Sequence, residues 1–452
     1  MQYIDTLRRR SKRKHRGKGI ALAFLTAILT TVIFGIVMSR YRHVDRDDGS
    51  HVYLLGTNPS VVAIDKWRGQ AFVTGYGASG RGQIWTLNLL TGHTAPITTR
   101  LKYPAGLAID ERLDRVFVVD GKGNKGIAID TRSNTVLYTV LMGNQPDGVT
   151  LWRRDMVVCE HTERVFVANY FGKGTRADRP NSTITLFDAL SGHVVRVVDV
   201  GQGLIALTVD ERSNRIFALN SIDASVVVLD ARNGTVRNVV RVGPNPLAMA
   251  VDERTARLFI TYNAFPIGLT PGSRKGQVQV LDANTGRIIR TITVGSLPRA
   301  LAIDMQDERV FVANSWSRSV SILNARTGQL VRTVAVAGIP VAAAVDAPTS
   351  RVFITISNTA TPYAPDIGLL GVGRVVILDA RSGTISSSIP AGVAPNMVQI
   401  DERARRAIVV NAGGRVPAQD RKIPLWPQEN VQEQVAPSIS VLDISRPRVL
   451  PL

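Results

Sequence analysis

The sequence has a single cysteine, Cys159, among its 452 residues, so an intrachain disulfide is excluded. Comparable segments of the chain have Asp at this point, at the end of a predicted strand, and we expect Cys159 to be a buried, inert thiol. The six histidines are not spaced as metal ligands, and the chain lacks a Walker loop, an HExxH motif and a nucleophile elbow. We therefore assign no catalytic residue, metal or cofactor, and the sequence favours a binding protein over an enzyme.

Acidic residues are nearly absent from the N-terminus: residues 1–43 carry ten Lys or Arg and one acid, Asp5. Eight of the basic residues lie between Arg8 and Lys18, and the nineteen residues from Ile20 to Met38 carry no charge. An uncharged run of this length can cross the hydrocarbon core of a bilayer as a helix. Because the basic block precedes the run, the positive-inside rule predicts a cytoplasmic N-terminus and an extracytoplasmic remainder.

The predicted organisation is a basic cytoplasmic tail (1–19), a transmembrane signal-anchor helix (20–39), a tether (40–50) and a repeat domain (51–452). The protein would then be a single-pass membrane protein that contacts the bilayer through residues 20–39. The alternative is a cleaved signal peptide, since Val37-Met38-Ser39 suits cleavage, and a secreted protein. After residue 43 the chain has 45 basic and 35 acidic residues, which suits either an anionic partner or a merely soluble surface.

The rest of the chain repeats one unit, of which residues 298–338 are a clear copy. This copy contains four short apolar runs bounded by turn residues: Arg299–Ile303, Val310–Ala313, Val320–Leu323 and Leu330–Val336. The second run is apolar on both alternating sides, so both sides must be covered, as in a sheet stacked between two neighbours. A four-stranded antiparallel meander that recurs every ~40–50 residues is typical of a β-propeller blade.

Recurring turn signals give the number of units. Asn324…Gly328 suits a hairpin closed by a left-handed Gly, and the signal recurs along the chain. Predicted first strands end at Asp65, Asp110, Cys159, Asp210, Asp252, Asp304, Asp346 and Asp401. His51–Leu55 resembles a fourth strand, and we expect it to complete the last unit and close the ring. The predicted fold is all-β, a single β-propeller of eight four-stranded blades (seven as the alternative), with the N-terminal transmembrane helix.

An Arg precedes each predicted second strand, as at Arg115, Arg215 and Arg309. We expect it to pair with the acids of the preceding turn. Such exposed pairs are worth about 0–1 kcal/mol each, so this ladder is interpreted as structural.

The repeated pattern P-x-x-[LVM]-x-[IV]-D, then R-[VLI]-F-[VI]-x-N, resembles the YVTN-repeat (YncE-like) β-propellers. Its best copies are Val310–Asn314 and Val165–Asn169. The resemblance implies an extracytoplasmic protein, in a family with members reported to bind nucleic acids or surfaces. Quinone-dependent propeller enzymes place Trp four residues after the hairpin Gly, whereas this chain has Arg196, Asn238, Arg290, Arg332 and Ser387 there. The repeated dipeptides of WD40 propellers are missing as well.

Predicted connections between second and third strands all leave the same face of a propeller, and four of them are long: 170–182, 264–276, 359–373 and 412–437. Loops longer than the minimum are often functional. Their aromatic and basic residues suit recognition of a protein, a glycan or another anionic ligand, although ordinary surface loops are the alternative. The candidate binding residues in these loops are Tyr170, Phe171, Arg176, Arg274, Lys275, Tyr363, Arg415 and Trp426.

The mouth of the central channel is a second candidate site. One residue near the start of each first strand is expected to line it: Ser60, Ala105, Asp147, Ile205, Leu247, Arg299, Val341 and Asn396. Arg299 and Asn396 stand out with Asp147 and join the candidate binding residues. A metal-dependent, lactonase-like hydrolase at this mouth is the enzymatic alternative, though it needs more convergent ligands. Binding of nucleic acid or an anionic polymer by the basic loops is a third hypothesis.

Overall fold

The computed structural model describes residues 43–45, 50–53, 55, 57–77, 82–121, 123–142, 155–170, 180–263, 275–358, 372–417 and 432–445. The chain divides into two compact units, Met1–Asp45 and Arg46–Leu452. The first unit contributes one described strand, β1 (His43–Asp45). No helix within the described residues has the length and hydrophobicity to cross a bilayer. The span predicted at 20–39 lies outside these residues and stays a prediction.

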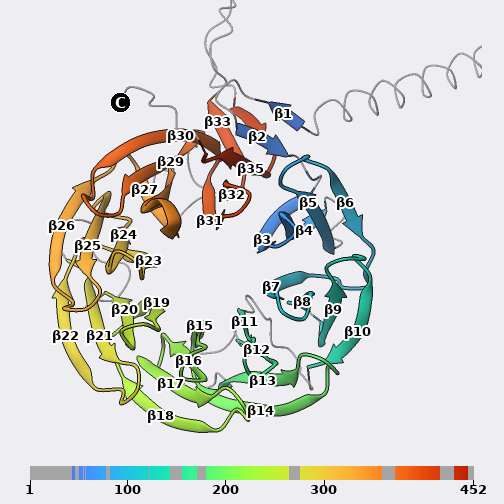
Figure 1. Cartoon of the computed structure of the whole chain (residues 1–452), viewed down its shortest axis with the longest axis horizontal. Helices are drawn as coiled ribbons and strands as arrows, with labels where there is room; N and C mark the ends of the chain where they lie inside the picture. The colour runs from blue at the N-terminus through green and yellow to red at the C-terminus, as the bar shows by residue number, and fades with distance from the viewer. Residues whose placement is uncertain are drawn as a thin grey trace, which may run out of the picture. The chain divides into compact units, whose positions relative to one another are not determined.

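The second unit is a ring of eight antiparallel sheets with four strands each, which we number blades 1 to 8 in chain order of their first strands (Figure 1). The innermost strands are β3 (Thr57–Asp65), β7 (Pro104–Asp110), β11 (Met156–Cys159), β15 (Leu204–Asp210), β19 (Pro246–Asp252), β23 (Pro298–Asp304), β27 (Ile339–Asp346) and β31 (Pro395–Asp401). Each ends at the residue that the turn signals predicted.

The second strands of blades 2 to 7 begin with the Arg-x-Phe part of the repeat, with Val, Ile or Leu at the middle position. The second strands are β4 (Gln70–Gly77), β8 (Arg115–Asp120), β12 (Arg164–Asn169), β16 (Arg215–Asn220), β20 (Arg257–Tyr262), β24 (Arg309–Asn314), β28 (Arg351–Ser357) and β32 (Arg406–Asn411). The third strands are β5 (Gly82–Asn88), β9 (Lys125–Asp130), β13 (Ser182–Asp188), β17 (Ser225–Asp230), β21 (Gln277–Asp282), β25 (Ser319–Asn324), β29 (Val372–Asp379) and β35 (Ser438–Asp443).

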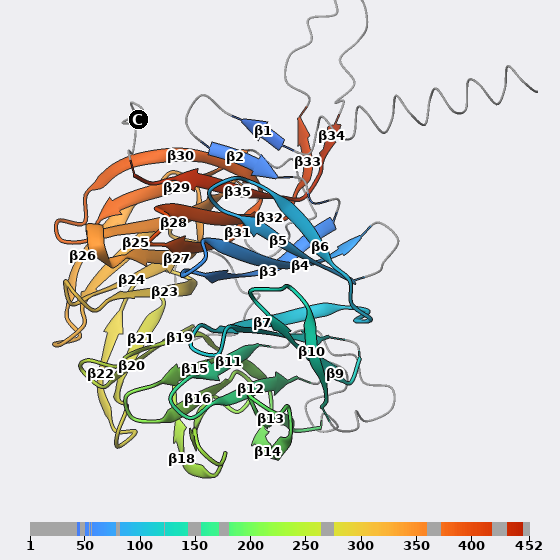
Figure 2. The same cartoon turned by 45° about the vertical axis from the view of Figure 1, so that its right-hand side comes forward.

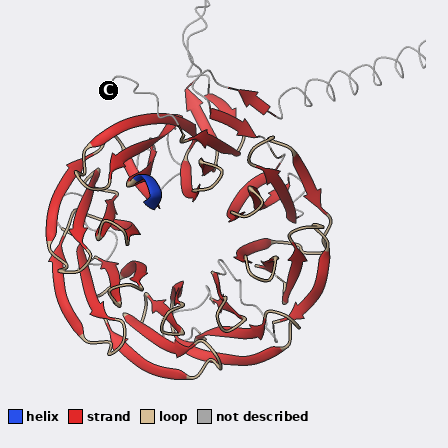
Figure 3. Cartoon of the chain, in the orientation of Figure 1, coloured by secondary structure: helices blue, strands red, loops and turns tan. Residues whose placement is uncertain are grey.

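The outer strands are β6 (Thr94–Ile97), β10 (Val136–Leu141), β14 (Val194–Gly201), β18 (Val236–Arg241), β22 (Ile288–Thr293), β26 (Leu330–Ala335), β30 (Ile385–Val393) and β2 (Ser50–Tyr53). Two further strands, β33 (Gly414–Pro417) and β34 (Gln432–Val435), form an antiparallel ribbon. The described chain contains one helical turn, η1 (Ala347–Thr349), between β27 and β28 (Figure 3).

The N-terminal strand of this unit closes the ring, as predicted. β2 pairs with β35, with Ser50 opposite Leu442 and Tyr53 opposite Ile439. β2 thereby supplies the outer strand of blade 8, whose other strands come from the C-terminus. The inner strand of blade 8, β31, also contacts β3 of blade 1. The count is therefore eight blades, and the seven-blade alternative is excluded.

Hydrophobic packing between blades confirms the expected burial of both sides of each sheet. Among the described residues, eight hydrophobic clusters each join two neighbouring blades. Phe311 in β24, for example, is fully buried against Val352 and Ile354 of the next blade. Seven blades bury such a Phe at the third position of the second strand: Phe72, Phe117, Phe166, Phe217, Phe259, Phe311 and Phe353. Each contributes about 1.5–3 kcal/mol by leaving water.

Candidate functional site

The antiparallel meander gives the ring two unlike faces. We call the face with the turns from first to second and from third to fourth strands the turn face. The other face, which we call the loop face, has the connections from second to third strands and from each outer strand to the next blade. The ribbon β33–β34 belongs to the loop face, because it lies between β32 and β35, and it extends beyond these strands (Figure 2).

Connections on the loop face are long in blades 3, 5, 7 and 8, as predicted. Four residues separate the second and third strands of blades 4 and 6, but 26 residues separate β32 from β35. Tyr170, partly buried, and Lys275, exposed, border two of the long connections, and Arg415 lies in β33. The other candidate loop residues lie outside the described residues: Phe171, Arg176, Arg274, Tyr363 and Trp426.

Buried polar side chains hold the base of the loop face where second strands end. The Asn411 Nδ2 donates to Ser438 Oγ at 3.2 Å and Ser440 Oγ at 2.9 Å, while its Oδ1 accepts from the Gly392 backbone N–H at 3.0 Å. Asn314 donates in the same way to two serines of β25. In blade 2 the equivalent Asp120 accepts backbone N–H groups from Lys102 and nearby residues.

These anchoring residues are the last letters of the repeat motif, and the sequence analysis assigned them no role. Their recurrence just before connections of variable length was the sequence signal that could have revealed this anchoring role. Because a buried polar group is costly without a partner, each Asn fixes the point where its connection leaves the sheet.

The channel-mouth residues occupy a special backbone position. Each described one is skipped in the pairing of the first and second strands, as Arg299 is between Pro298 and Ala300. The same register shift occurs at Ser60, Ala105, Ile205, Leu247, Val341 and Asn396. A β-bulge leaves its extra residue unpaired and re-aims the side chain, a device common beside binding sites. The innermost strands therefore carry a ring of bulge residues at their loop-face ends, and we call this the bulge ring.

The bulge ring is chemically uneven. Arg299 and Asn396 are exposed, whereas the other described members are half-buried and, apart from Ser60, apolar. Asp147, the expected member from blade 3, lies outside the described residues. Within the described part of the chain, no three His, Cys, Asp or Glu side chains are close enough to hold a metal ion. The described ring thus offers hydrogen-bond donors and apolar surface, which suit binding of an anionic or amide-bearing group.

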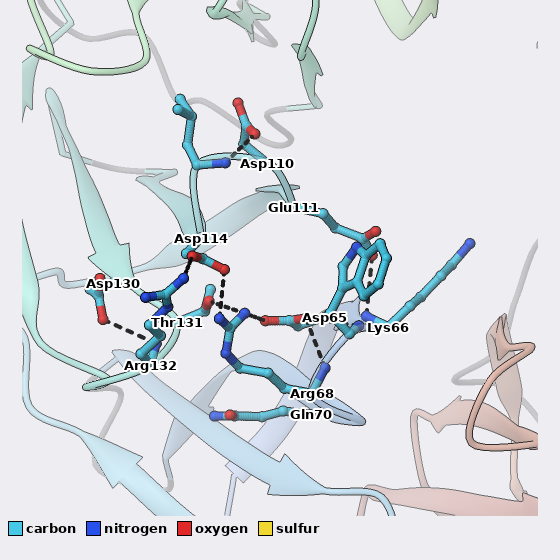
Figure 4. Close-up of polar contacts among 12 residues, drawn as sticks. Asp65, Lys66, Arg68, Gln70, Asp110, Glu111, Asp114, Asp130, Thr131 and Arg132 are labelled. Carbon is cyan, nitrogen blue, oxygen red and sulfur yellow. Dashed lines mark hydrogen bonds and ion pairs between the residues drawn. The ribbon is translucent and has the colours of Figure 1, made fainter.

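The turn face, in contrast, is a network of turns whose backbone N–H groups are capped by side chains (Figure 4). In blade 1, Asp65 Oδ1 accepts the backbone N–H groups of Trp67 and Arg68, each at 3.1 Å. Arg68 also forms ion pairs with Asp65 at 2.8 Å and with Asp114 of blade 2 at 2.6 Å, and Arg132 joins Asp114. Side-chain caps of this kind replace water as partners of turn amides.

Glutamates extend this network from blade to blade. The Glu111 carboxylate accepts the Lys66 backbone N–H at 3.1 Å, and Glu160 accepts that of Glu111 at 3.0 Å. Glu211 accepts the Glu160 N–H at 2.7 Å, and Glu253 accepts that of Glu211 at 3.1 Å. Burial, with the neighbouring acids, raises the pKa of Glu160 and of Glu253. The chain of glutamates ties blades 1 to 5 together and leaves their carboxylates occupied.

Two of the arginines before the second strands, Arg115 and Arg215, do not pair with acids of the preceding turn as expected, whereas Arg309 donates to the Glu308 backbone carbonyl of that turn at 3.3 Å. Arg115 donates to the backbone carbonyl of Leu190 at 2.7 Å, and Arg215 donates to that of Ala283 at 3.0 Å. Both acceptors lie in the hairpin turn of the following blade, so these arginines join blades and do not neutralise their own turn.

The prediction for Cys159 is confirmed: the residue is fully buried. Burial raises the pKa of its thiol to about 11. A thiol with this pKa stays protonated at neutral pH and is a poor nucleophile.

Comparisons with known proteins agree on the fold. No family model and no curated protein matches the chain. Among solved structures, the chain is similar to BamB from Moraxella catarrhalis, at 15% identity over 82% of this chain and 96% of that one, with a TM-score of 0.53. It is also similar to Sqt1 from Saccharomyces cerevisiae, at 10% identity over 85% and 96%, with a TM-score of 0.56. The hydrazine synthase of Kuenenia stuttgartiensis shares 13% identity over 75% and 97%, with a TM-score of 0.50. At these identities the likeness establishes a β-propeller and nothing narrower.

Proposed function

We propose that the protein is a membrane-anchored, extracytoplasmic β-propeller of the YVTN-repeat type that binds a partner through its loop face. The observation that carries the proposal is the contrast between the faces: long connections leave only the loop face, whereas the turn face consists of short turns with satisfied amides. Because binding residues concentrate on loops held by a rigid scaffold, the loop face is the recognition surface.

The proposed contact set combines the long connections with the bulge ring. Arg299 and Asn396 supply donors at the channel mouth, and Lys275 and Arg415 are basic residues of the long connections of blades 5 and 8. With the aromatic and basic residues of the long connections, this set suits an anionic patch on a protein or a glycan. Aromatic and Arg side chains are the usual anchors of such contacts.

The test replaces residues 418–431 with Asn-Gly, the preferred two-residue hairpin turn, so that Pro417 and Gln432 remain paired in the ribbon. Cross-linking in native membranes and mass spectrometry then compare partner capture by this variant and by Arg326→Ala, an exposed turn-face control. We expect the first variant to lose the captured partner and the second to keep it. Unchanged capture by this variant, and by variants shortened at 171–179, 264–274 and 359–371, would refute the loop-face proposal.

The anchor is tested separately by alkaline extraction and by labelling with a membrane-impermeant reagent. We expect the full-length protein to stay in the membrane pellet and to be labelled from the extracytoplasmic side. Release into the supernatant, or labelling only from the cytoplasmic side, would contradict the anchor without bearing on the loop face.

A further inference from the structure

We propose that the outer edges of blades 3 to 6 bind an acidic, extended polypeptide segment that adds a strand to a blade. We call the strands β14, β18, β22 and β26 the rim edges. They form the outside of the ring between its two faces (Figure 1). The proposal therefore goes beyond the loop-face function and concerns a different surface.

The rim edges lack the features that normally protect a sheet edge. Protein edge strands are usually short or interrupted by Pro, which prevents another strand from pairing with them. β6 has four residues and contains Pro96, β30 contains Pro390, and β2 has four residues. The rim edges, by contrast, are six to eight residues long and contain neither Pro nor Lys. The outer edges of blades 7, 8 and 1 are thus protected, whereas those of blades 3 to 6 are open. The outer strand of blade 2, β10, is also open but contains no arginine.

The rim edges also expose apolar side chains of the β-branched and aliphatic kinds that strands favour. Val239 in β18 is 57% exposed and Val331 in β26 is 50% exposed. All six residues of β18 are exposed or half-buried. The remaining exposed large apolar residues of the rim edges are Val195, Val197, Val236, Ile288, Ile289 and Leu330. An added strand would cover such side chains on alternate positions while its backbone pairs with the free edge.

The charge of the rim edges indicates what kind of added strand would bind them. The rim edges contain five arginines, Arg196, Arg237, Arg241, Arg290 and Arg332, against one acid, Asp199. Asp230 already neutralises Arg237. Among the described residues, Arg196, Arg241 and Arg290 have no acidic partner within ion-pair distance. The surplus favours a segment with Glu or Asp on the side chains that face the rim.

Three of the arginines, Arg196, Arg290 and Arg332, are held in place at the seams between blades. A Cβ on Gly328 in the next blade would lie 3.6 Å from Cδ of Arg290, and one on Gly234 would lie 3.5 Å from Cδ of Arg196. Arg332 donates to the backbone carbonyl of Ser382 at 2.8 Å. The aliphatic stems therefore rest on the neighbouring hairpin, which orders the guanidinium groups beside the open edge.

A second copy of this chain fits the rim edges poorly, because pairing two of them would bring arginines against arginines. Nucleic acid would meet the arginines but would leave the edge backbone unpaired. An acidic segment satisfies both the backbone groups and the guanidinium groups, so it is the occupant that we propose.

The test uses the full-length protein in nanodiscs and two fluorescent ten-residue peptides, one alternating Glu with Val and one alternating Lys with Val. We expect the Glu peptide to bind, and hydrogen exchange to show protection in β14, β18, β22 or β26 but not in β6. The double variant Arg241→Glu with Arg290→Glu should bind this peptide about tenfold more weakly or worse, about 1.4 kcal/mol. The control Arg326→Glu, on the turn face, should bind normally.

Four results would overturn the proposal. They are no binding of the Glu peptide, equal binding of the Lys peptide, unaltered affinity in the double variant, or protection confined to the loop face. Self-association of the protein through the same amides would show that the occupant is a second copy. The variant with Asn-Gly in place of 418–431 should retain peptide binding, which separates this proposal from the loop-face function. Circular dichroism and thermal unfolding confirm that each variant is folded.

Discussion

The turn face and the loop face are made by the same eight repeats, yet only the turn face keeps them uniform. On the turn face, seven first strands end at a buried Asp, such as Asp304, which accepts the backbone N–H groups of Gln306 and Asp307. On the loop face, the connections between second and third strands range from four residues to 26.

The difference shows where the fold constrains the sequence. A capped turn satisfies its own amides through one carboxylate, so a change there leaves buried groups without partners. A loop-face connection begins above an anchored base, as at Asn411, and the polar groups beyond this base can be satisfied by water. Length and composition can therefore change on the loop face at little cost to the fold, which is where recognition can evolve.

The largest effect is expected for Asp304→Ala. This variant removes the acceptor of two turn amides, so we expect it to lower the free energy of unfolding by about 2 kcal/mol. Burial raises the pKa of Asp304, which means that the fold disfavours its charge. Asp304→Asn keeps an acceptor without the charge and should stay within about 1 kcal/mol of the parent protein. Denaturant unfolding measures both, and equal losses would contradict the capping role.

A pH profile separates two groups of turn-face acids. Burial raises the pKa of Glu160 above its ordinary value, so the folded state binds its proton first as pH falls, and this group adds stability on acidification. The hydrogen bond from the Ser382 backbone N–H lowers the pKa of Asp379, so this group supports the fold above the ordinary range and its contribution is lost as pH falls below it.

The free energy of unfolding, measured from pH 7 to pH 3, should show both effects. In Glu160→Gln, the gain in stability on acidification above the ordinary Glu range should be smaller than in the parent protein. In Asp379→Asn, the loss of stability below the ordinary Asp range should be smaller. If both variants keep the parent profile, the turn acids do not differ as described.

A smaller effect is expected from shortening the loop face. Replacing residues 418–431 with Asn-Gly leaves the pairing of Gly414 with Val435 intact. We expect the free energy of unfolding to change by less than about 0.5 kcal/mol, as is usual for changes away from the core. A loss comparable to that of Asp304→Ala, measured in the same denaturant series, would show that the two faces do not differ in constraint.

The smallest effect is expected for Arg326→Ala. The Arg326 side chain is 68% exposed, and its partner Glu308 also pairs with Arg254. Solvent and salt screen exposed pairs, so the unfolding midpoint should not move measurably. A clear shift would indicate that the exposed ion pairs of the turn face do more than the capped turns imply.

Much of the fold could be predicted from the sequence because the repeats are local. Short apolar runs bounded by turn residues predicted the strands. The recurring glycines predicted the hairpins, and Gly328 has the expected left-handed backbone with φ of 68°. The partners of Arg115 and Arg215 could not be predicted, since they lie in the neighbouring blade and depend on how blades stack. The bulges at the channel mouth depend on strand register, which single side chains do not reveal.

The sequence predicted which face carries the long connections, and the candidate site residues stay a prediction. The lengths of the four long connections identify the face that varies, because chain direction alternates regularly in a meander. Which side chains converge above the mouth depends on loop conformation, and five of the ten candidate residues lie outside the described chain.

The central claim, that the loop face is the recognition surface, is tested most directly by acylating lysines in native membranes and in vesicles reconstituted with the purified protein alone. Lys102, Lys125 and Lys275 are exposed on the loop face, and Lys66 is exposed on the turn face. Because the bilayer is present in both samples, a difference reports the partner. The account predicts protection of one or more of the three loop-face lysines in native membranes and no change at Lys66. Protection of Lys66 alone would contradict it.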